Sequence, residues 1–307
     1  MAKYIVKRLL AAFITLLIAA TLTFFIMHFV PGGPFMSEKA PSPEIRAQME
    51  AKYGLDKPLF EQYLTYMKNL FKGDLGVSYV QAKNRSVLEV IKTAFPVSAK
   101  VGGLAILLSF VLGVPLGCVS ALHRSKWQDN IIRVLSTLGV AVPGFVVSTG
   151  LMLILAVKLK ILPVSGLRQT SGYILPVVSL ALSPMSYITR IMRSSMLDVI
   201  GQDYIRTAKA KGMSKFIVTF KHALRNSLIP VITYMGPMVA NILTGSFVVE
   251  KVFNVPGLGR YFVKSIESRD YTIIMGTTVF YAAILILMAL LCDVLYKLVD
   301  PRIKLEK

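Results

Sequence analysis

The sequence contains few of the residues from which disulfide and metal sites are built. Its 307 residues include two cysteines, three histidines and one tryptophan. Cys118 and Cys292 fall inside long apolar runs, and no two histidines have metal-ligand spacing. We therefore expect no disulfide framework and no metal site, and we interpret the cysteines as small apolar packing residues.

Motifs for nucleotide binding and hydrolysis are also missing. The dipeptide Gly-Lys does not occur, so the phosphate-binding loop GxxxxGK[ST] is absent, as are HExxH and GxSxG. The apolar runs are nearly free of ionisable side chains, which a membrane enzyme would need. We therefore expect a protein that is not an enzyme and that binds no cofactor itself.

Long apolar runs dominate the chain instead. Six runs of 20 to 24 residues occupy 9–30, 101–122, 134–157, 169–189, 226–249 and 273–292. A bilayer core about 30 Å thick requires roughly 20 helical residues. The runs therefore predict an all-α polytopic membrane protein with six transmembrane helices. The first run is longer than the apolar region of a signal peptide and lacks a small-residue cleavage site, so it is expected to be retained.

The formal net charge of +19 is distributed unevenly over the connecting segments. One set of segments carries 18 Lys and Arg and consists of 1–8, 123–133, 190–225 and 293–307. The short loops on the other side, 158–168 and 250–272, carry seven. By the positive-inside rule both termini are cytoplasmic. Because the bilayer accounts for this charge, we expect no nucleic-acid partner.

The long segment 31–97 is predicted to be extracytoplasmic. Ser42, Pro43 and Glu44 have the order of a helix N-terminus, and Gly54 that of its end. Apolar residues with helical spacing follow over 56–73. This second helix either lies on the membrane or a neighbouring subunit, or covers the outer end of the protein's own helices.

The outer loop 250–272 has its own turn and helix signals. Pro256 and Gly257 suit the central positions of a type II turn. Leu258, Phe262 and Ile266 are spaced as on a short helix, which either dips towards a pore mouth or lies at the interface. Asp270 is placed to cap the sixth span.

Prolines and glycines interrupt several spans. They are Pro115, Pro143, Pro176, Pro184, Pro230 and Pro237, with Gly139, Gly144, Gly236 and Gly245. Membrane helices tolerate them where neighbouring groups satisfy the freed backbone. They predict close helix packing or kinks. The alternative is that some of the kinks are bending points of a transport cycle.

Residues 203–212, DYIRTAKAKG, form a short basic segment in the predicted cytoplasmic loop. Asp203 suits an N-cap and Gly212 a C′ position, so a two-turn helix is predicted over 204–211. Ser214 is expected to cap a second helix that carries Phe216, Phe220 and Leu224 on one face.

A two-turn helix is too short to be stable in water by itself. The small residues Thr207, Ala208 and Ala210 predict that a partner surface approaches its backbone. Arg206, Lys209 and Lys211 would surround that contact with charge. The alternative is an anchor that only enforces the positive-inside topology.

The stretch RTAKAKG, followed by HALR, resembles the conserved cytoplasmic loop of ABC-importer permeases. That family's pattern is Glu-Ala-Ala, three residues, Gly, nine residues and Ile-x-Leu-Pro. Ala208, Gly212 and Leu224 match it. The departures, Arg206, Thr207, His222 and Arg225, resemble the B-type permeases of the peptide-transporting branch. Further similar stretches lie at 53–58, 73–78, 252–259, 269–271 and 300–302.

The resemblance covers essentially the whole chain and implies the type I ABC importer permease fold. Its divisions would be an N-terminal helix 1–30, the extracytoplasmic segment 31–97, a permease domain 95–300 with a coupling loop 190–225, and a tail 301–307. In this family the first helix of the loop docks on the ATPase. The implied coupling residues are Asp203, Tyr204, Ile205, Arg206, Thr207, Ala208, Lys209, Ala210, Lys211, Gly212, Ser214, His222, Leu224 and Arg225.

The resemblance also implies partners and a substrate. A second homologous permease, two cytoplasmic ATPases that bind the ATP, and an extracytoplasmic binding protein would assemble in a bacterial inner membrane to import oligopeptides or dipeptides. Nickel and glutathione importers share this architecture and remain alternatives. An autonomous secondary transporter is a further alternative, although no inverted repeat or buried carboxylate supports it.

Overall fold

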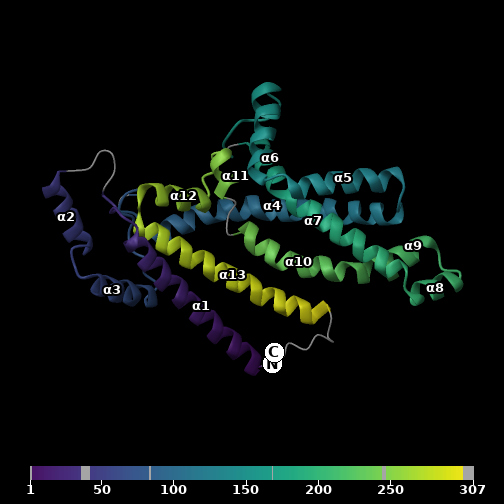
Figure 1. Cartoon of the computed structure of the whole chain (residues 1–307), viewed down its shortest axis with the longest axis horizontal. Helices are drawn as coiled ribbons and strands as arrows, with labels where there is room; N and C mark the ends of the chain where they lie inside the picture. Colours follow the sequence, from purple (N-terminus) through teal and green to yellow (C-terminus); the bar gives the residue numbers. More distant parts are fainter. Residues whose placement is uncertain (1, 36–41, 83, 168, 244–246, 300–307) are drawn as a thin grey trace. The chain divides into compact units, whose positions relative to one another are not determined.

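The computed structural model describes residues 2–35, 42–82, 84–167, 169–243 and 247–299. Within these ranges the chain is helical and forms no strand, apart from one isolated bridge between Val77 and Ser86. Figure 1 shows the helices in chain order. The predicted tail 301–307 lies outside the described residues.

All six predicted spans correspond to helices of sufficient length and apolarity. Four are single helices or a helix with its adjoining turn: α1 (Ala2–Phe29), α4 (Val87–Leu122), α7 (Ile174–Ile200) preceded by the 3₁₀ turn η2 (Thr170–Tyr173), and α13 (Tyr271–Val299). A fifth contains α10 (Arg225–Leu243) and the helical residues that precede it from Lys215. The remaining run is a bent pair. It consists of α5 (Trp127–Ala141) and α6 (Gly144–Leu151), the latter extended by the π-helix η1 (Met152–Lys158).

The bend between α5 and α6 measures 105°. Val142 and Pro143 both adopt extended backbone angles there. Proline lacks an N–H and disfavours the helical conformation of the residue before it, which explains the break. Pro184 in α7 and Pro230 and Pro237 in α10 lie inside helices that continue past them. The predicted kink is therefore sharp at Pro143 alone among these four prolines.

The chain divides into two compact units. The first comprises residues 1–97 and 256–286, and the second residues 98–255 and 287–307. In the second unit, α7 packs against α5, α6 and α10. Its buried core contains Ile188, Met192, Met196 and Val231.

Small residues bring α4 and α7 close together in this second unit. A Cβ added to Gly117 would lie 2.7 Å from the Thr189 carbonyl oxygen, and one added to Gly113 would lie 2.9 Å from the Met185 carbonyl oxygen. The Thr189 hydroxyl donates to the Gly113 carbonyl at 3.2 Å. The two backbones therefore touch at two glycines that the sequence analysis did not name. Of the glycines it named, Gly139 packs closely, since an added Cβ would collide with the Ser186 hydroxyl, whereas Gly144 has nothing within 4 Å and Gly245 lies outside the described residues.

In the first unit, the helices of segment 31–97 have largely the predicted ends. α2 spans Pro43–Tyr53, with the Ser42 hydroxyl accepting from the Ile45 N–H at 3.5 Å and Gly54 in the left-handed conformation at φ 69°. α3 spans Leu59–Phe71. One face of α3, formed by Leu59, Tyr63 and Tyr66, packs against a cluster of Phe24 from α1 with Tyr271 and Met275 from α13. These contacts favour the interpretation of α3 as a cover for the protein's own helices.

The type II turn predicted at Pro256 and Gly257 is wrong. Gly257 has φ −93° and ψ 174°, an extended conformation, because it is the N-cap of α12 (Leu258–Ser268). The chain instead adopts left-handed angles at Asn254, at φ 52°, between α11 (Phe247–Val252) and α12, and again at Arg269, at φ 55°, where α12 ends.

Asp270 directly precedes α13 as predicted, but its carboxylate caps a different segment. It accepts hydrogen bonds from the Ser78 hydroxyl at 2.5 Å and from the N–H groups of residues 79, 80 and 81 at 2.9–3.2 Å. The Thr272 hydroxyl donates to it at 3.0 Å. Asp270 is fully buried. It therefore fixes the loop before α4 to the start of α13.

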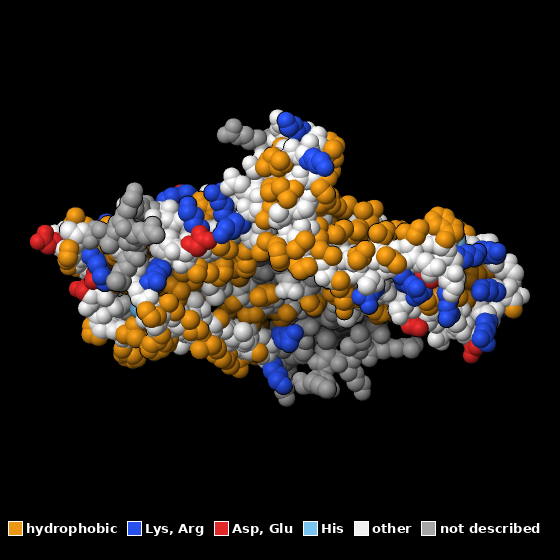
Figure 2. Space-filling model, turned by 45° about the horizontal axis from the view of Figure 1, so that its top comes forward, with side chains coloured by type: hydrophobic (Ala, Val, Ile, Leu, Met, Phe, Trp, Pro, Cys, Tyr) orange, Lys and Arg blue, Asp and Glu red, His pale blue; other side chains and the backbone are white. Residues whose placement is uncertain are grey.

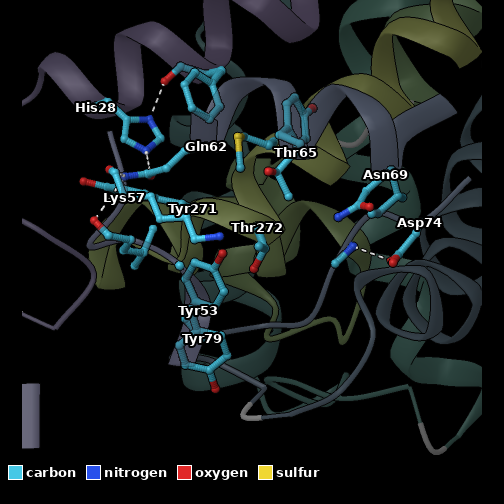
Figure 3. A pocket seen from close by; sticks show the side chains of 17 residues that line it. His28, Tyr53, Lys57, Gln62, Thr65, Asn69, Asp74, Tyr79, Tyr271 and Thr272 are labelled. Carbon is cyan, nitrogen blue, oxygen red and sulfur yellow. Dashed lines mark hydrogen bonds between the residues drawn. The ribbon is translucent and has the colours of Figure 1, made fainter. Parts of the chain in front are cut away.

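An aromatic pocket of about 160 Å³ lies within this first unit. Figure 3 shows Tyr53, Tyr79, Tyr271 and His28 around it. His28 contacts the Phe24 carbonyl through Nδ1 at 2.8 Å and Gln62 Oε1 through Nε2 at 3.3 Å. Burial raises the pKa of Tyr79 to about 12, so this phenol is neutral at physiological pH.

Candidate functional site

The short basic helix predicted in the loop 190–225 is present as α8 (Asp203–Ala210). It begins one residue earlier than predicted, and the N-cap is Gln202, which is extended at φ −74° and ψ 151°. The prediction that Asp203 is the N-cap is therefore wrong, because Asp203 is already helical. Its carboxylate lies in the first turn, where the helix dipole favours a negative charge.

The other end of α8 is as predicted. Gly212 has φ 75°, and its N–H donates to the Lys209 carbonyl at 3.0 Å. The Met213 N–H donates to the Ala208 carbonyl at 3.3 Å. A left-handed glycine that satisfies the last carbonyls of a helix ends it sharply. The chain reverses within these residues.

One face of α8 is packed onto the protein itself. Ile205 is 0% exposed and Ala208 is 5% exposed, and both belong to a core with Met196, Val218 and Ala223. The prediction that Ala208 lets a partner approach is therefore wrong, because its methyl group faces inward. Burial of these two residues also explains how so short a helix is held in place.

The other face of α8 is exposed. It presents side chains of both predicted kinds, small and cationic, together with one aromatic ring: Thr207 and Ala210, Arg206, Lys209 and Lys211, and Tyr204. Arg206 and Asp203 approach to 3.7 Å, at side-chain exposures of 76% and 98%. So exposed an ion pair is worth little. Figure 2 shows Lys and Arg gathered at the end of the molecule formed by α8 and α9 (Lys215–Ile217).

The segment after α8 begins as predicted. The Ser214 hydroxyl accepts from the Ile217 N–H at 3.3 Å, so Ser214 is the N-cap of α9. Asn226 Nδ2 donates to the Tyr204 hydroxyl at 2.8 Å and to the His222 carbonyl at 3.3 Å. These bonds tie α8 to the start of α10, where Arg225 is exposed.

The predicted single face of Phe216, Phe220 and Leu224 is only partly present. Phe216 and Phe220 are exposed and their rings lie 4.5 Å apart, whereas Leu224 packs against the core. The reason is η3 (Val218–Leu224), a π-helix. Hydrogen bonds from i to i+5 widen the turn, so residues four apart do not stay on one face.

Sequence reasoning missed an ion pair that fixes the end of α7, from which the chain passes into α8. Arg193 Nε and Nη2 donate to the two carboxylate oxygens of Asp129, at 2.7 and 2.9 Å. The Ser120 hydroxyl and the Ser125 N–H also donate to Asp129, at 2.6 and 2.9 Å. The pair joins α5 to α7 with a fully buried and fully bonded carboxylate. The sequence signal for this pair was that Asp129 is the single acidic residue of the otherwise basic loop 123–133.

No group of three or more metal-binding side chains occurs among the described residues. The candidate site built around α8 lies at the surface of the second unit. It consists of a helix anchored by one face, with small and cationic side chains on the other.

Comparison with known protein families identifies the chain. Residues 113–305 match the family described as binding-protein-dependent transport system inner membrane component. Residues 1–102 match the N-terminal region of the same kind of membrane component. The chain belongs to this family. It is therefore a multi-pass permease subunit of a bacterial inner-membrane ABC importer, which confirms the resemblance seen in the sequence.

Relatives of known name are similar over the whole chain. The dipeptide transport system permease protein DppB of Bacillus subtilis (strain 168) is 47% identical over 307 residues, covering 100% of this chain and 99% of that protein. The oligopeptide transport system permease protein OppB of Haemophilus influenzae is 46% identical over 306 residues, covering 99% and 100%. The similarity between this permease and these two relatives therefore extends over essentially the full length of each protein.

The fold is also similar to that of a solved transporter. A chain of the MetNI methionine ABC transporter, in an inward-facing conformation, matches with a TM-score of 0.59 at 15% identity. The match covers 69% of this permease and 97% of that chain. At this level of identity the likeness confirms the fold, in agreement with the predicted type I importer architecture.

Proposed function

We propose that this permease imports oligopeptides or dipeptides. The observation that carries the proposal is the identity of 47% and 46%, over essentially full length, with permeases named for dipeptide and oligopeptide transport. Nickel and glutathione importers, which the sequence left open, are the alternative, and the relatives described above favour peptides over them.

We place both termini, the loop 123–133 and the loop 190–225 in the cytoplasm. The excess of 18 over seven Lys and Arg supports this orientation. The unit formed by residues 1–97 and 256–286 then contains the extracytoplasmic segment 31–97 and most of the loop 250–272, to which a binding protein would deliver the substrate.

We assign α8 as the coupling helix that docks on a cytoplasmic ATPase. Its anchored face, with Ile205 and Ala208 buried, would pass a displacement of α8 to the rest of its unit. Its exposed face, with Thr207 and Ala210 between cationic side chains, suits close approach by an acidic groove. The bonds of Tyr204 and Asn226 would link the same displacement to α10.

The remaining partners follow from this assignment. A second permease would complete the peptide path, and two separate ATPases would bind and hydrolyse the ATP, because this chain has no phosphate-binding loop. ATP-driven closure of the ATPases would move the coupling helices and alternate the path between outward and inward openings.

The proposal is tested with the complete transporter reconstituted in liposomes. We expect uptake of a peptide such as trialanine that requires ATP, the ATPases and peptide-loaded binding protein. Peptide movement by the purified chain alone down an ion gradient would contradict the proposal and support a secondary transporter.

A further inference from the structure

A cationic cavity of about 510 Å³ lies between α5 and α7, beside the Asp129–Arg193 pair. Three arginines line it: Arg133, Arg190 and Arg193. Among the described residues, Asp129 forms an ion pair with one of these arginines. Both of its carboxylate oxygens accept hydrogen bonds from Arg193.

The charges of Arg133 and Arg190 are not neutralised in this way. Both side chains are exposed, and neither forms an ion pair with an acid among the described residues. Because guanidinium groups bind phosphate and carboxylate oxygens in a two-pronged geometry, two unpaired arginines on one cavity favour an oxyanion as its ligand.

A second cavity, of about 320 Å³, adjoins the first and is almost entirely apolar. The two cavities share four lining residues: Ile132, Ser136, Leu138 and Thr189. The apolar part continues along Leu135, Val142 and Leu182. A ligand that fills both parts therefore has an anionic head and a hydrocarbon tail.

We propose that this double cavity is a binding site for an anionic phospholipid. Arg133 and Arg190 hold the headgroup phosphate, and an acyl chain lies in the apolar part between α5 and α7. Basic pockets between membrane helices bind such headgroups on the cytoplasmic side. The assignment to the inner leaflet rests on the proposed orientation of the chain, whereas the lipid binding does not.

The site touches the elements that lead to α8. α7 carries Arg190 and Arg193 and ends next to α8, and α5, which carries Arg133, ends at the bend before Pro143. A bound lipid would thus hold α5 against α7, the helix that leads to the proposed coupling helix.

The test measures lipids retained by the complete purified transporter, by native mass spectrometry, after incubation with vesicles of phosphatidylglycerol or phosphatidylcholine. The variant carries Arg133→Gln and Arg190→Gln. These residues lie outside the bonds to Asp129, so the fold is maintained. The control, Arg124→Gln, removes one charge from the same loop but does not line either cavity.

We expect the double variant to retain about 30-fold less phosphatidylglycerol, since each basic residue contributes about fivefold at an anionic membrane surface. Phosphatidylcholine retention and the control should be unchanged. Equal loss in the control, or no loss in the double variant, would overturn the proposal.

A peptide carboxylate is the competing oxyanion. If phosphatidylglycerol retention were unchanged while the double variant lost its discrimination between trialanine and trialanine amide, the lipid assignment would be wrong. The retention measurement needs no transport, so a failure of peptide uptake would count only against the proposed function.

Discussion

At the scale of single residues, the buried carboxylate of Asp270 organises the first unit. It accepts five hydrogen bonds, three of them from consecutive backbone N–H groups. The sequence placed Asp270 correctly before α13 but could not identify its partners, because Ser78 lies 192 residues away. Local patterns specify helix ends, and they do not specify which distant loop meets them.

We predict that Asp270→Ala destabilises the first unit by about 3–5 kcal/mol, because several buried donors lose their acceptor. Limited proteolysis of the loop 74–86 and thermal unfolding in detergent measure the effect. Asp56→Ala, which removes an exposed acid of the same unit, serves as control. Equal protection of the loop in both variants would contradict the role given to Asp270.

Gly117 gives a second residue-scale prediction. A Cβ there lies 2.6 Å from Met192 Cβ and 2.7 Å from a backbone oxygen, so Gly117→Ala forces α4 and α7 apart. We expect a loss of about 1–3 kcal/mol. Gly103→Ala on the same helix meets nothing within 4 Å and should be neutral. Similar melting temperatures for the two variants would show that α4 and α7 do not pack as described.

At the scale of elements, both ends of α2, the C-terminal end of α8 and the start of α9 were more predictable than the faces of these helices. Ser42, Gly54, Gly212 and Ser214 have the predicted roles because capping depends on neighbouring residues. The inward position of Ala208 depends on contacts with α7 and η3, which no local pattern specifies. The π-helix η3 likewise changes the register without a sequence signal.

The sharp end of α8 allows a prediction about transport. Gly212→Val places a β-branched residue at φ 75°, which costs roughly 1–2 kcal/mol and loosens the reversal after α8. We expect membrane insertion to survive, uptake to fall strongly, and ATPase activity to lose its stimulation by loaded binding protein.

Gly201→Val is the matched control, because Gly201 has φ −77° and an added Cβ there would make only ordinary van der Waals contacts, at 3.6 and 3.8 Å. Uptake by Gly212→Val equal to that of this control would remove the reason for assigning α8 a coupling role.

At the scale of the whole molecule, the apolar runs predicted all six spans. The apolar runs did not predict the shape of the third span, which is bent by 105° at Pro143. Candidate site residues were predicted as a group from the resemblance, and the structure separates them into the buried Ile205 and Ala208, the half-buried His222 and Leu224, and an exposed remainder. Burial is a property of the folded unit, so sequence spacing alone did not reveal it.

The orientation of the molecule is also testable. A single cysteine at Lys160 should react with a membrane-impermeant maleimide in intact cells, and one at Lys211 only after permeabilisation, with Cys118 and Cys292 replaced by alanine. The opposite labelling pattern would reverse the assignment of the inner and outer sides.

The most direct test of the central claim is site-specific photo-crosslinking in the assembled transporter. Crosslinking side chains are placed at Thr207 and Ala210 on the exposed face of α8, and at Lys160 as the control. We predict that both α8 positions capture an ATPase subunit, with yields that change on adding ATP, and that position 160 captures none. If neither α8 position traps an ATPase under any nucleotide condition, α8 is not the coupling helix.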